Sequence, residues 1–165
     1  MASFDAAIGL VLAREGGYKP AGDGDPGGET NFGVTKRDHP DVDIRALTRD
    51  TAAAIYRRDW DYLRLGEVKD QDVAAKVFDM TVNLGRQTAI RRAQRALNYL
   101  TPRHAEVTVD GYLGDETIAA LNAADAERLL LALRAYHAAR YVELVEGPDT
   151  RYETWSAGWL KRAMS

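Results

Sequence analysis

Apolar residues recur at helical spacing along most of the chain. The first stripe has the i, i+3, i+4, i+7 spacing of an amphipathic helix and consists of Phe4, Ala7, Ile8, Val11 and Leu12. The same kind of spacing predicts further helices over about 48–63, 72–84, 88–100, 115–122 and 125–146, and a short one in the tail. Thr48 and Asp115 are suitable N-caps, and Gly85 and Gly147 are suitable stop signals. The chain is therefore predicted to be mainly α-helical.

One segment, from Tyr18 to Gly33, interrupts the helical pattern. It is rich in glycine, and its run Asp25-Pro26-Gly27-Gly28 is suited to a tight turn, because proline fixes φ and glycine accepts positive φ. A short hairpin or ordered loop is expected there. A length of 165 residues allows one sizeable core and is too short for two comfortable domains. The predicted fold is a single compact helical domain of α+β type with a small hairpin near the N-terminus.

Composition and charge narrow the functional classes. Hydrophobic residues make up 45% and charged residues 28%, which is ordinary for a folded globular protein. The net charge of -3 gives no basic excess for a phosphate backbone, so no nucleic-acid partner is expected. The absence of cysteine excludes disulfides, zinc-thiolate sites and cysteine nucleophiles.

The sequence shows neither a signal-peptide pattern nor an apolar run of membrane-spanning length. We therefore expect synthesis in the cytoplasm without stable membrane insertion, and delivery by another component if the protein acts outside. His39, His104 and His137 are scattered and lack the spacing of a zinc hydrolase. With no phosphate loop or dinucleotide fingerprint either, no metal and no cofactor is expected.

Glu15 is the first candidate for chemistry. It follows Val11 by four residues and Leu12 by three, so its carboxyl is predicted to point toward the buried side at the C-terminal end of a helix. Burial and the helix dipole would both raise the pKa of such a carboxyl, as a general acid requires. The alternative is that Glu15 faces solvent and the glycine-rich segment is a surface connection.

Glycoside hydrolysis needs such an acid together with a second carboxylate. The loop offers Asp23, Asp25 and Glu29. Asp25 is the best placed of the three because the turn can fix its side chain, and the hydroxyl of Thr30 could hold a water molecule. The sequence leaves open whether the reaction inverts or retains the anomeric configuration.

The stretch EGGYKPAGDGDPGGETNFGVT, residues 15–35, resembles the signature of glycoside hydrolase family 108, the lysozyme-like N-acetylmuramidases of phage and prophage endolysins and secretion activators. The family motif reads approximately E-G-G-Y, a spacer, then D-x-G-G-x-T-x-x-G-[IV]-T, and every fixed position is matched. The resemblance implies Glu15 as the catalytic acid and places the aspartate and threonine of the family on Asp25 and Thr30. The extra glycines of the spacer leave Asp23 as a rival to Asp25.

The resemblance extends beyond the motif. Residues 78–85, FDMTVNLG, are similar to the D-x-x-V-N-x-G helix of the family, which implies that Asp79 and Asn83 border the substrate groove. Asn83 could instead serve only as a hydrogen-bonding residue at the helix end. Tyr18 is a candidate for stacking on sugar rings. Residues 86–165 resemble a helical peptidoglycan-binding region, packed as one compact unit on a lysozyme-like catalytic region at 1–85.

The implied function is a muramidase that cleaves the β-1,4 bond between N-acetylmuramic acid and N-acetylglucosamine in peptidoglycan, as a phage or prophage endolysin. Its partner would be the glycan strand, and the protein is expected to be a monomer that a holin or a secretion system releases to the periplasm or cell wall. Two alternatives remain: a non-catalytic peptidoglycan-binding module, and a muramidase that serves protein secretion instead of lysis.

Overall fold

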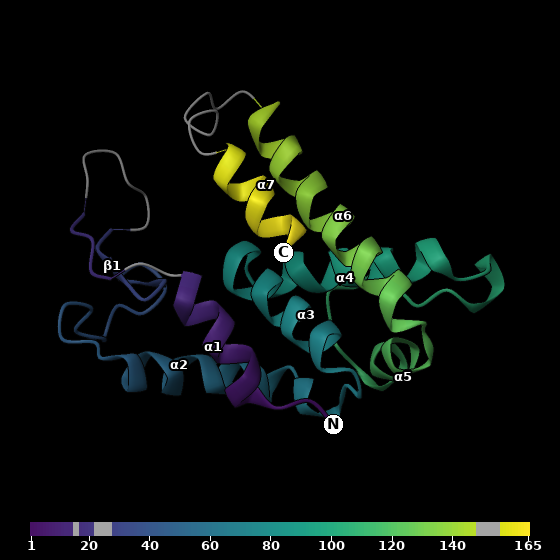
Figure 1. Cartoon of the computed structure of the whole chain (residues 1–165), viewed down its shortest axis with the longest axis horizontal. Helices are drawn as coiled ribbons and strands as arrows, with labels where there is room; N and C mark the ends of the chain where they lie inside the picture. Colours follow the sequence, from purple (N-terminus) through teal and green to yellow (C-terminus); the bar gives the residue numbers. More distant parts are fainter. Residues whose placement is uncertain (15–16, 22–27, 148–155) are drawn as a thin grey trace.

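The computed structural model describes residues 1–14, 17–21, 28–147 and 156–165, and most of them are helical (Figure 1). The α-helices are α1 (Phe4–Arg14), α2 (Arg49–Tyr62), α3 (Gln71–Leu84), α4 (Arg86–Leu100), α5 (Asp115–Ala123), α6 (Ala126–Val145) and α7 (Ser156–Met164). Two 3₁₀ turns, η1 (Leu65–Glu67) and η2 (Arg103–Ala105), and two short strands, β1 (Thr30–Asn31) and β2 (Val34–Thr35), complete the described elements. The mainly α prediction with a small hairpin near the N-terminus is confirmed.

Side-chain caps set several helix starts. Thr48 caps α2 in a reciprocal capping box with Thr51, as predicted. Asp70 caps α3 through the amides of residues 72 and 73, and Asp125 caps α6 through the amide of Arg128. These caps satisfy amides that have no partner inside the helix.

The predicted cap at Asp115 is wrong by one position. The N-cap of α5 is Gly114, and Asp115 is the first helical residue. The carboxylate of Asp115 accepts a hydrogen bond of 2.6 Å from Nη1 of Arg64, so it ties α5 to the segment that follows α2. An acidic residue in the first turn also suits the helix dipole.

Helix α3 lies at the centre of the core, where it packs against α1, α4 and α6. Phe78 on α3 is fully buried and meets the rings of Phe4, Tyr56 and Trp60 edge-on, with centroid separations of 6.0, 6.2 and 5.4 Å. Edge-to-face pairs at this distance stabilise a core beyond their burial alone. Trp60 is a core residue here.

The C-terminal helix α7 runs beside α6 (Figure 1) and is attached to α3 by Lys76. The buried ammonium of Lys76 donates a hydrogen bond of 2.7 Å to the carbonyl of Ala163, at the last turn of α7. A cation is favoured at this end of a helix. The first and last parts of the chain are therefore held together through α3.

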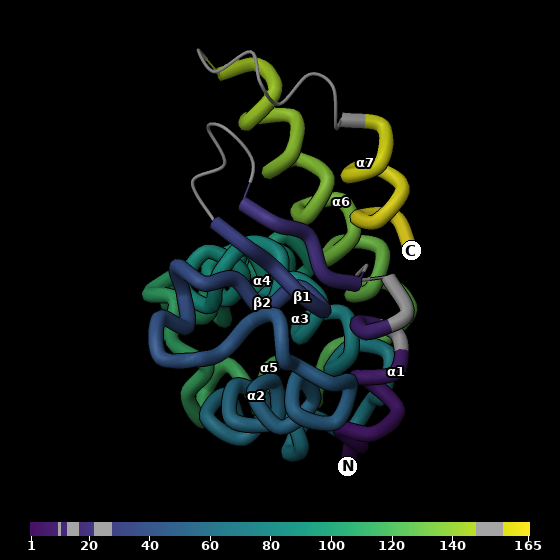
Figure 2. Tube along the Cα trace, turned by 90° about the vertical axis from the view of Figure 1, so that its left-hand side faces the viewer, coloured from purple at the N-terminus to yellow at the C-terminus, as the bar shows by residue number. Residues whose placement is uncertain are grey.

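The hairpin stands at one side of the helices, as Figure 2 shows. Its two strands pair with the register Thr30↔Thr35 and Asn31↔Val34, joined by Phe32 and Gly33 at φ of 51° and 78°. Two successive positive φ angles match the type I′ turn of a tight hairpin. The buried amide of Asn31 donates to the carbonyls of residues 44 and 47, and the Tyr56 hydroxyl donates to the carbonyl of Phe32. These bonds fix the hairpin to α2 and to the loop before it.

Candidate active site

A groove of about 630 Å³ separates the hairpin from α2 and the C-terminal end of α3. This volume is within the range of small-molecule binding sites. The lining comes from β2 and the turn after it, from α2, and from the α3–α4 junction: Gly33, Val34, Thr35, Arg37, Asp38, His39, Tyr56, Asp59, Thr81, Val82, Asn83, Leu84, Gly85 and Arg86. Most of these positions carry polar or charged groups that could hydrogen-bond a sugar.

Thr30 is the first residue of β1 and is not among the residues that line the groove. Its cross-strand partner is Thr35, which lines the groove, and directly opposed residues of an antiparallel pair share one face of the sheet. The neighbouring pair, Asn31 and Val34, is buried. Thr30 is thus paired with a residue of the groove lining, while its catalytic role stays a prediction.

Asn83 lines the groove near the end of α3. Its amide nitrogen also donates a hydrogen bond of 3.0 Å to the carbonyl of Asp79. Both sequence-based interpretations of Asn83 therefore describe real features, because the helix-end hydrogen bond fixes a side chain that is exposed to the groove. Contact with substrate stays a prediction.

Asp79 occupies a different environment, although it shares a helix face with Asn83. Its side chain is 5% exposed, and its carboxylate lies 3.6 Å from Nζ of Lys76, 3.2 Å from Nη2 of Arg162 and 3.9 Å from Nδ1 of His137. It is absent from the lining of the groove and borders instead a cleft of about 170 Å³ between α1, α3, α6 and the C-terminus. Attraction to the cations of α3 and α7 holds its carboxylate in the buried cluster, so Asp79 does not line this groove among the described residues. Its role in binding substrate stays a prediction.

Tyr18 also lies away from the groove lining. Its hydroxyl donates a hydrogen bond of 3.0 Å to Oε2 of Glu29 and accepts one of 3.1 Å from Arg45, and the Arg45 guanidinium lies 5.1 Å from the ring centroid. This cation-π contact occupies one face of the ring, and stacking of Tyr18 on a sugar stays a prediction. In this arrangement Tyr18 attaches its segment to the hairpin. An antiparallel bridge between Lys19 and Thr30 joins the same two segments.

The candidate carboxylates Glu15, Asp23 and Asp25 lie outside the described residues. Their predicted roles, including the raised pKa of Glu15, stay predictions. The described residues that adjoin them are Arg14 at the end of α1 and Gly28, two residues before β1.

Sequence reasoning missed Asp38 and His39, which line the groove just after β2. The Asp38 carboxylate accepts a hydrogen bond of 2.8 Å from the Thr35 hydroxyl. Hydrogen bonding from the Arg37 guanidinium, 3.0 Å away, is the main cause that lowers the pKa of Asp38 below its ordinary value, so Asp38 is ionised at neutral pH. The polar run K-R-D-H at 36–39, immediately after the motif, was the available signal.

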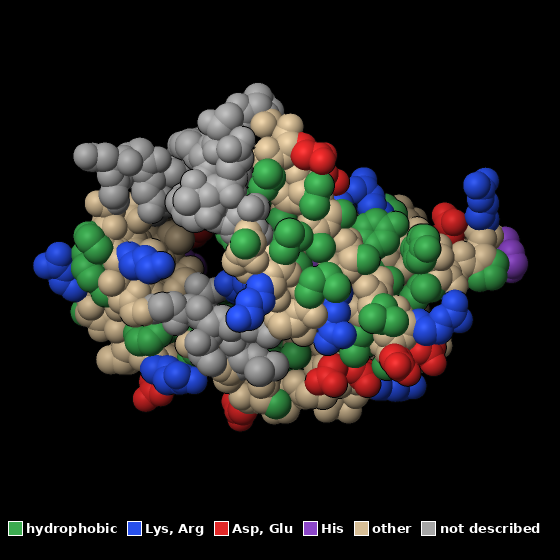
Figure 3. All heavy atoms as spheres, turned by 45° about the horizontal axis from the view of Figure 1, so that its top comes forward, with side chains coloured by type: hydrophobic (Ala, Val, Ile, Leu, Met, Phe, Trp, Pro, Cys, Tyr) green, Lys and Arg blue, Asp and Glu red, His purple; other side chains and the backbone are tan. Residues whose placement is uncertain are grey.

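The groove combines both signs of charge. The Arg86 guanidinium lies 3.7 Å from the carboxylate of Asp59, and both residues line the groove. Acidic and basic side chains are also interspersed over the molecular face in Figure 3. Recognition in the groove therefore rests on individual hydrogen bonds more than on a field of one sign.

The described ranges contain neither a metal-binding cluster nor a membrane-spanning helix. These residues include no group of three or more histidine and acidic side chains arranged to hold a metal ion. No helix in that part of the chain has both the length and the apolar character needed to cross a membrane.

Comparison with known proteins connects this geometry to an enzyme family. The family model described as "Glycosyl hydrolase 108" matches residues 8–85, and the one described as "Predicted Peptidoglycan domain" matches residues 88–164. The solved structure titled "Structure of Brucella abortus SagA" superposes with a TM-score of 0.76 at 26% identity, covering 97% of this chain and 88% of the other. No curated protein matches. The resemblance inferred from the motif is confirmed. The assignment of catalysis to residues 1–85 and of peptidoglycan binding to residues 86–165 stays a prediction.

Proposed function

We propose that this chain, a glycoside hydrolase that joins a glycosyl hydrolase 108 domain to a peptidoglycan domain, is an N-acetylmuramidase. Its substrate would be the glycan strand of peptidoglycan, cut at the β-1,4 bond between N-acetylmuramic acid and N-acetylglucosamine. The observation that carries the proposal is the polar groove of about 630 Å³, lined mostly by residues of the hydrolase match. Thr35, the cross-strand partner of Thr30, belongs to this lining.

The proposed mechanism uses the motif residues. Glu15 protonates the leaving glycosidic oxygen, and the Asp25 carboxylate, with the Thr30 hydroxyl, serves the attacking water or the oxocarbenium-like centre. Asn83 and the ionised Asp38 line the same groove, where their amide and carboxylate groups would orient sugar hydroxyl and acetamido groups. The configuration of the first product distinguishes inversion from retention.

The biological setting we propose is that of an endolysin released through a holin to the periplasm or cell wall. The same bond cleavage would serve protein secretion if it occurred locally and without lysis. Release of a cytoplasmic marker on expression with a holin would support the endolysin role, and wall cleavage with cells left intact would support the secretion role.

The direct test compares digestion of purified peptidoglycan by the wild type, Glu15→Gln and Thr30→Ala. Glu15→Gln should abolish release of soluble fragments, because it removes the transferable proton at nearly constant volume. Thr30→Ala should lower the rate by about 100-fold, the lower end expected for loss of a group that acts through a proton transfer.

Glu106→Gln is the matched control, since it removes an exposed carboxylate outside the groove lining and outside the hairpin region. It should retain wild-type cleavage. Full activity in Glu15→Gln, or no cleavage by a folded wild type, would contradict the proposal.

A further inference from the structure

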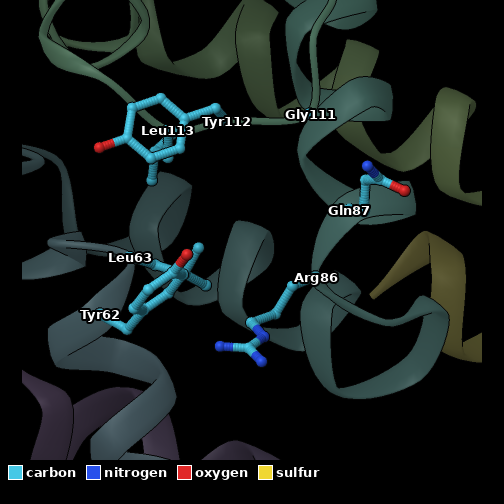
Figure 4. A pocket seen from close by; sticks show the side chains of 7 residues that line it. All are labelled: Tyr62, Leu63, Arg86, Gln87, Gly111, Tyr112 and Leu113. Carbon is cyan, nitrogen blue, oxygen red and sulfur yellow. The ribbon is translucent and has the colours of Figure 1, made fainter.

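A second pocket lies where the two matched regions meet. It measures about 250 Å³ and is formed by the end of α2, the start of α4 and the turn before α5 (Figure 4). Its lining consists of Tyr62, Leu63, Arg86, Gln87, Gly111, Tyr112 and Leu113. The hydrolase match ends at residue 85 and the peptidoglycan-domain match begins at residue 88, so both regions contribute to this pocket.

Two tyrosines stand on either side of this pocket, as Figure 4 shows. Tyr62 is 64% exposed and Tyr112 is 60% exposed, whereas the adjacent Leu63 and Leu113 are buried. The leucines anchor the two segments in the core, and the tyrosines present their rings to solvent. Paired exposed aromatic rings with a hydroxyl at the edge suit a ligand with apolar faces and a polar rim, such as a sugar ring.

The backbone that carries Tyr112 is held rigidly. The fully buried Gln94 donates from Nε2 to the carbonyl of Tyr112 at 3.0 Å and accepts from the amide of Gly111 at 2.9 Å. Asp110 accepts from the amide of Tyr112 at 2.8 Å. Gly111 has φ of 82°, and a Cβ there would lie 2.9 Å from the side chain of Gln87. An exposed aromatic ring on a backbone fixed in this way loses little freedom when it binds a ligand.

Arg86 connects this pocket to the groove. It lines both, its guanidinium lies 4.8 Å from the centroid of the Tyr62 ring, and its side chain remains 53% exposed. A pocket of about 250 Å³ is smaller than the roughly 300–1,000 Å³ of a complete ligand site. It is suited to one part of a longer ligand whose remainder lies in the groove.

We infer that the pocket between Tyr62 and Tyr112 is a distal subsite for one further sugar of the glycan strand, outside the groove in which cleavage occurs. The two rings stack on the sugar, and Arg86 binds the lactyl carboxylate of a muramic acid unit. This inference rests on the proposed function for the identity of the ligand. It assigns substrate binding to a surface shared by both matched regions.

Binding and cleavage are measured separately in the test. Binding of long and short uncrosslinked peptidoglycan glycan oligomers is measured by calorimetry in the Glu15→Gln background, where substrate stays intact. Adding Tyr62→Ala and Tyr112→Ala together should weaken binding of long oligomers by about fivefold to 100-fold, from two aromatic contacts. Binding of oligomers too short to extend beyond the groove should be unchanged.

Tyr99→Ala is the matched control, because Tyr99 is a 75% exposed tyrosine outside the pocket. Arg86→Gln should weaken binding of muramic acid oligomers more than binding of N-acetylglucosamine oligomers of equal length, which lack the carboxylate. Equal affinity for long oligomers with and without the two tyrosines would overturn the subsite, as would a loss of the same size in Tyr99→Ala.

The two proposals fail in different ways. If the wild type cleaves peptidoglycan but the double tyrosine variant binds long oligomers normally, only the subsite is wrong. If the wild type cleaves nothing while the tyrosine effect on binding is present, the subsite holds and the muramidase proposal is wrong.

Discussion

The groove and the buried cluster around Asp79 are built from the same helix, yet they use polar residues in opposite ways. Asn83 opens onto the groove, while Asp79, one turn earlier, is surrounded by Lys76, His137 and Arg162 and is almost completely buried. The groove keeps its polar groups accessible to a ligand. The cluster places the carboxylate of Asp79 against basic side chains inside the protein and so joins α3 to α6 and α7. The elements that pack beside a polar residue of α3 therefore decide whether it is accessible to a ligand or holds helices together.

The largest effect should come from breaking the cluster. Asp79→Ala removes the anion next to two basic side chains and leaves their charges buried without it, which typically costs about 3–5 kcal/mol of unfolding free energy. Urea denaturation followed by circular dichroism measures the change. A loss below about 1 kcal/mol would contradict the cohesive role of Asp79.

Asn83→Ala should lower cleavage of peptidoglycan more clearly than it lowers stability. It removes a hydrogen bond of 3.0 Å to the carbonyl of Asp79 and a longer one of 3.5 Å to its carboxylate, so stability should fall by about 1–2 kcal/mol. Loss of a sugar contact of similar strength should lower kcat/KM on peptidoglycan by about tenfold. If Asn83→Ala is destabilised as much as Asp79→Ala and cleaves normally, the distinction between the two regions fails.

The ion pair between the buried Arg92 and the half-exposed Glu143 should give the smallest effect on stability, and this effect should depend on pH. This pair joins α4 to α6, and the Arg92 hydrogen bond is the main cause that lowers the pKa of Glu143 below its ordinary 4.5. A lowered folded-state pKa means that the stabilisation is fully present above the unfolded-state value and is lost as pH falls through the folded-state value.

Glu143→Gln should therefore lower stability at pH 7 by less than about 1 kcal/mol and reduce the loss of stability on acidification below about pH 4.5. Thermal melts of both proteins between pH 3 and 7 measure this. Parallel curves, with the same difference at every pH, would show that ionisation of Glu143 does not contribute.

The sequence predicted the helices well because their apolar stripes are long and regular, and local signals such as Thr48 mark where they begin. It misplaced the α5 cap because the role of Asp115 depends on Arg64, which lies 51 positions away. Such a pairing exists only after folding and has no local signature.

The parts of the candidate site that depend on local sequence were predictable, and the parts that depend on distant contacts were not. The hairpin around Phe32 and Gly33 follows from local turn chemistry, and it pairs Thr30 with Thr35, a residue of the groove lining. The position of Asp79 depends on Lys76 on its own helix and on Arg162, 83 residues further along the chain, so the spacing to Asn83 could not reveal it. The pocket between Tyr62 and Tyr112 likewise requires segments that meet only in the folded chain.

Mass spectrometry of the sugar ends that the wild-type protein releases from purified peptidoglycan tests the proposed muramidase activity directly. A muramidase predicts new reducing ends that carry N-acetylmuramic acid. New reducing ends at N-acetylglucosamine, or release of peptides without any new sugar end, would contradict the account.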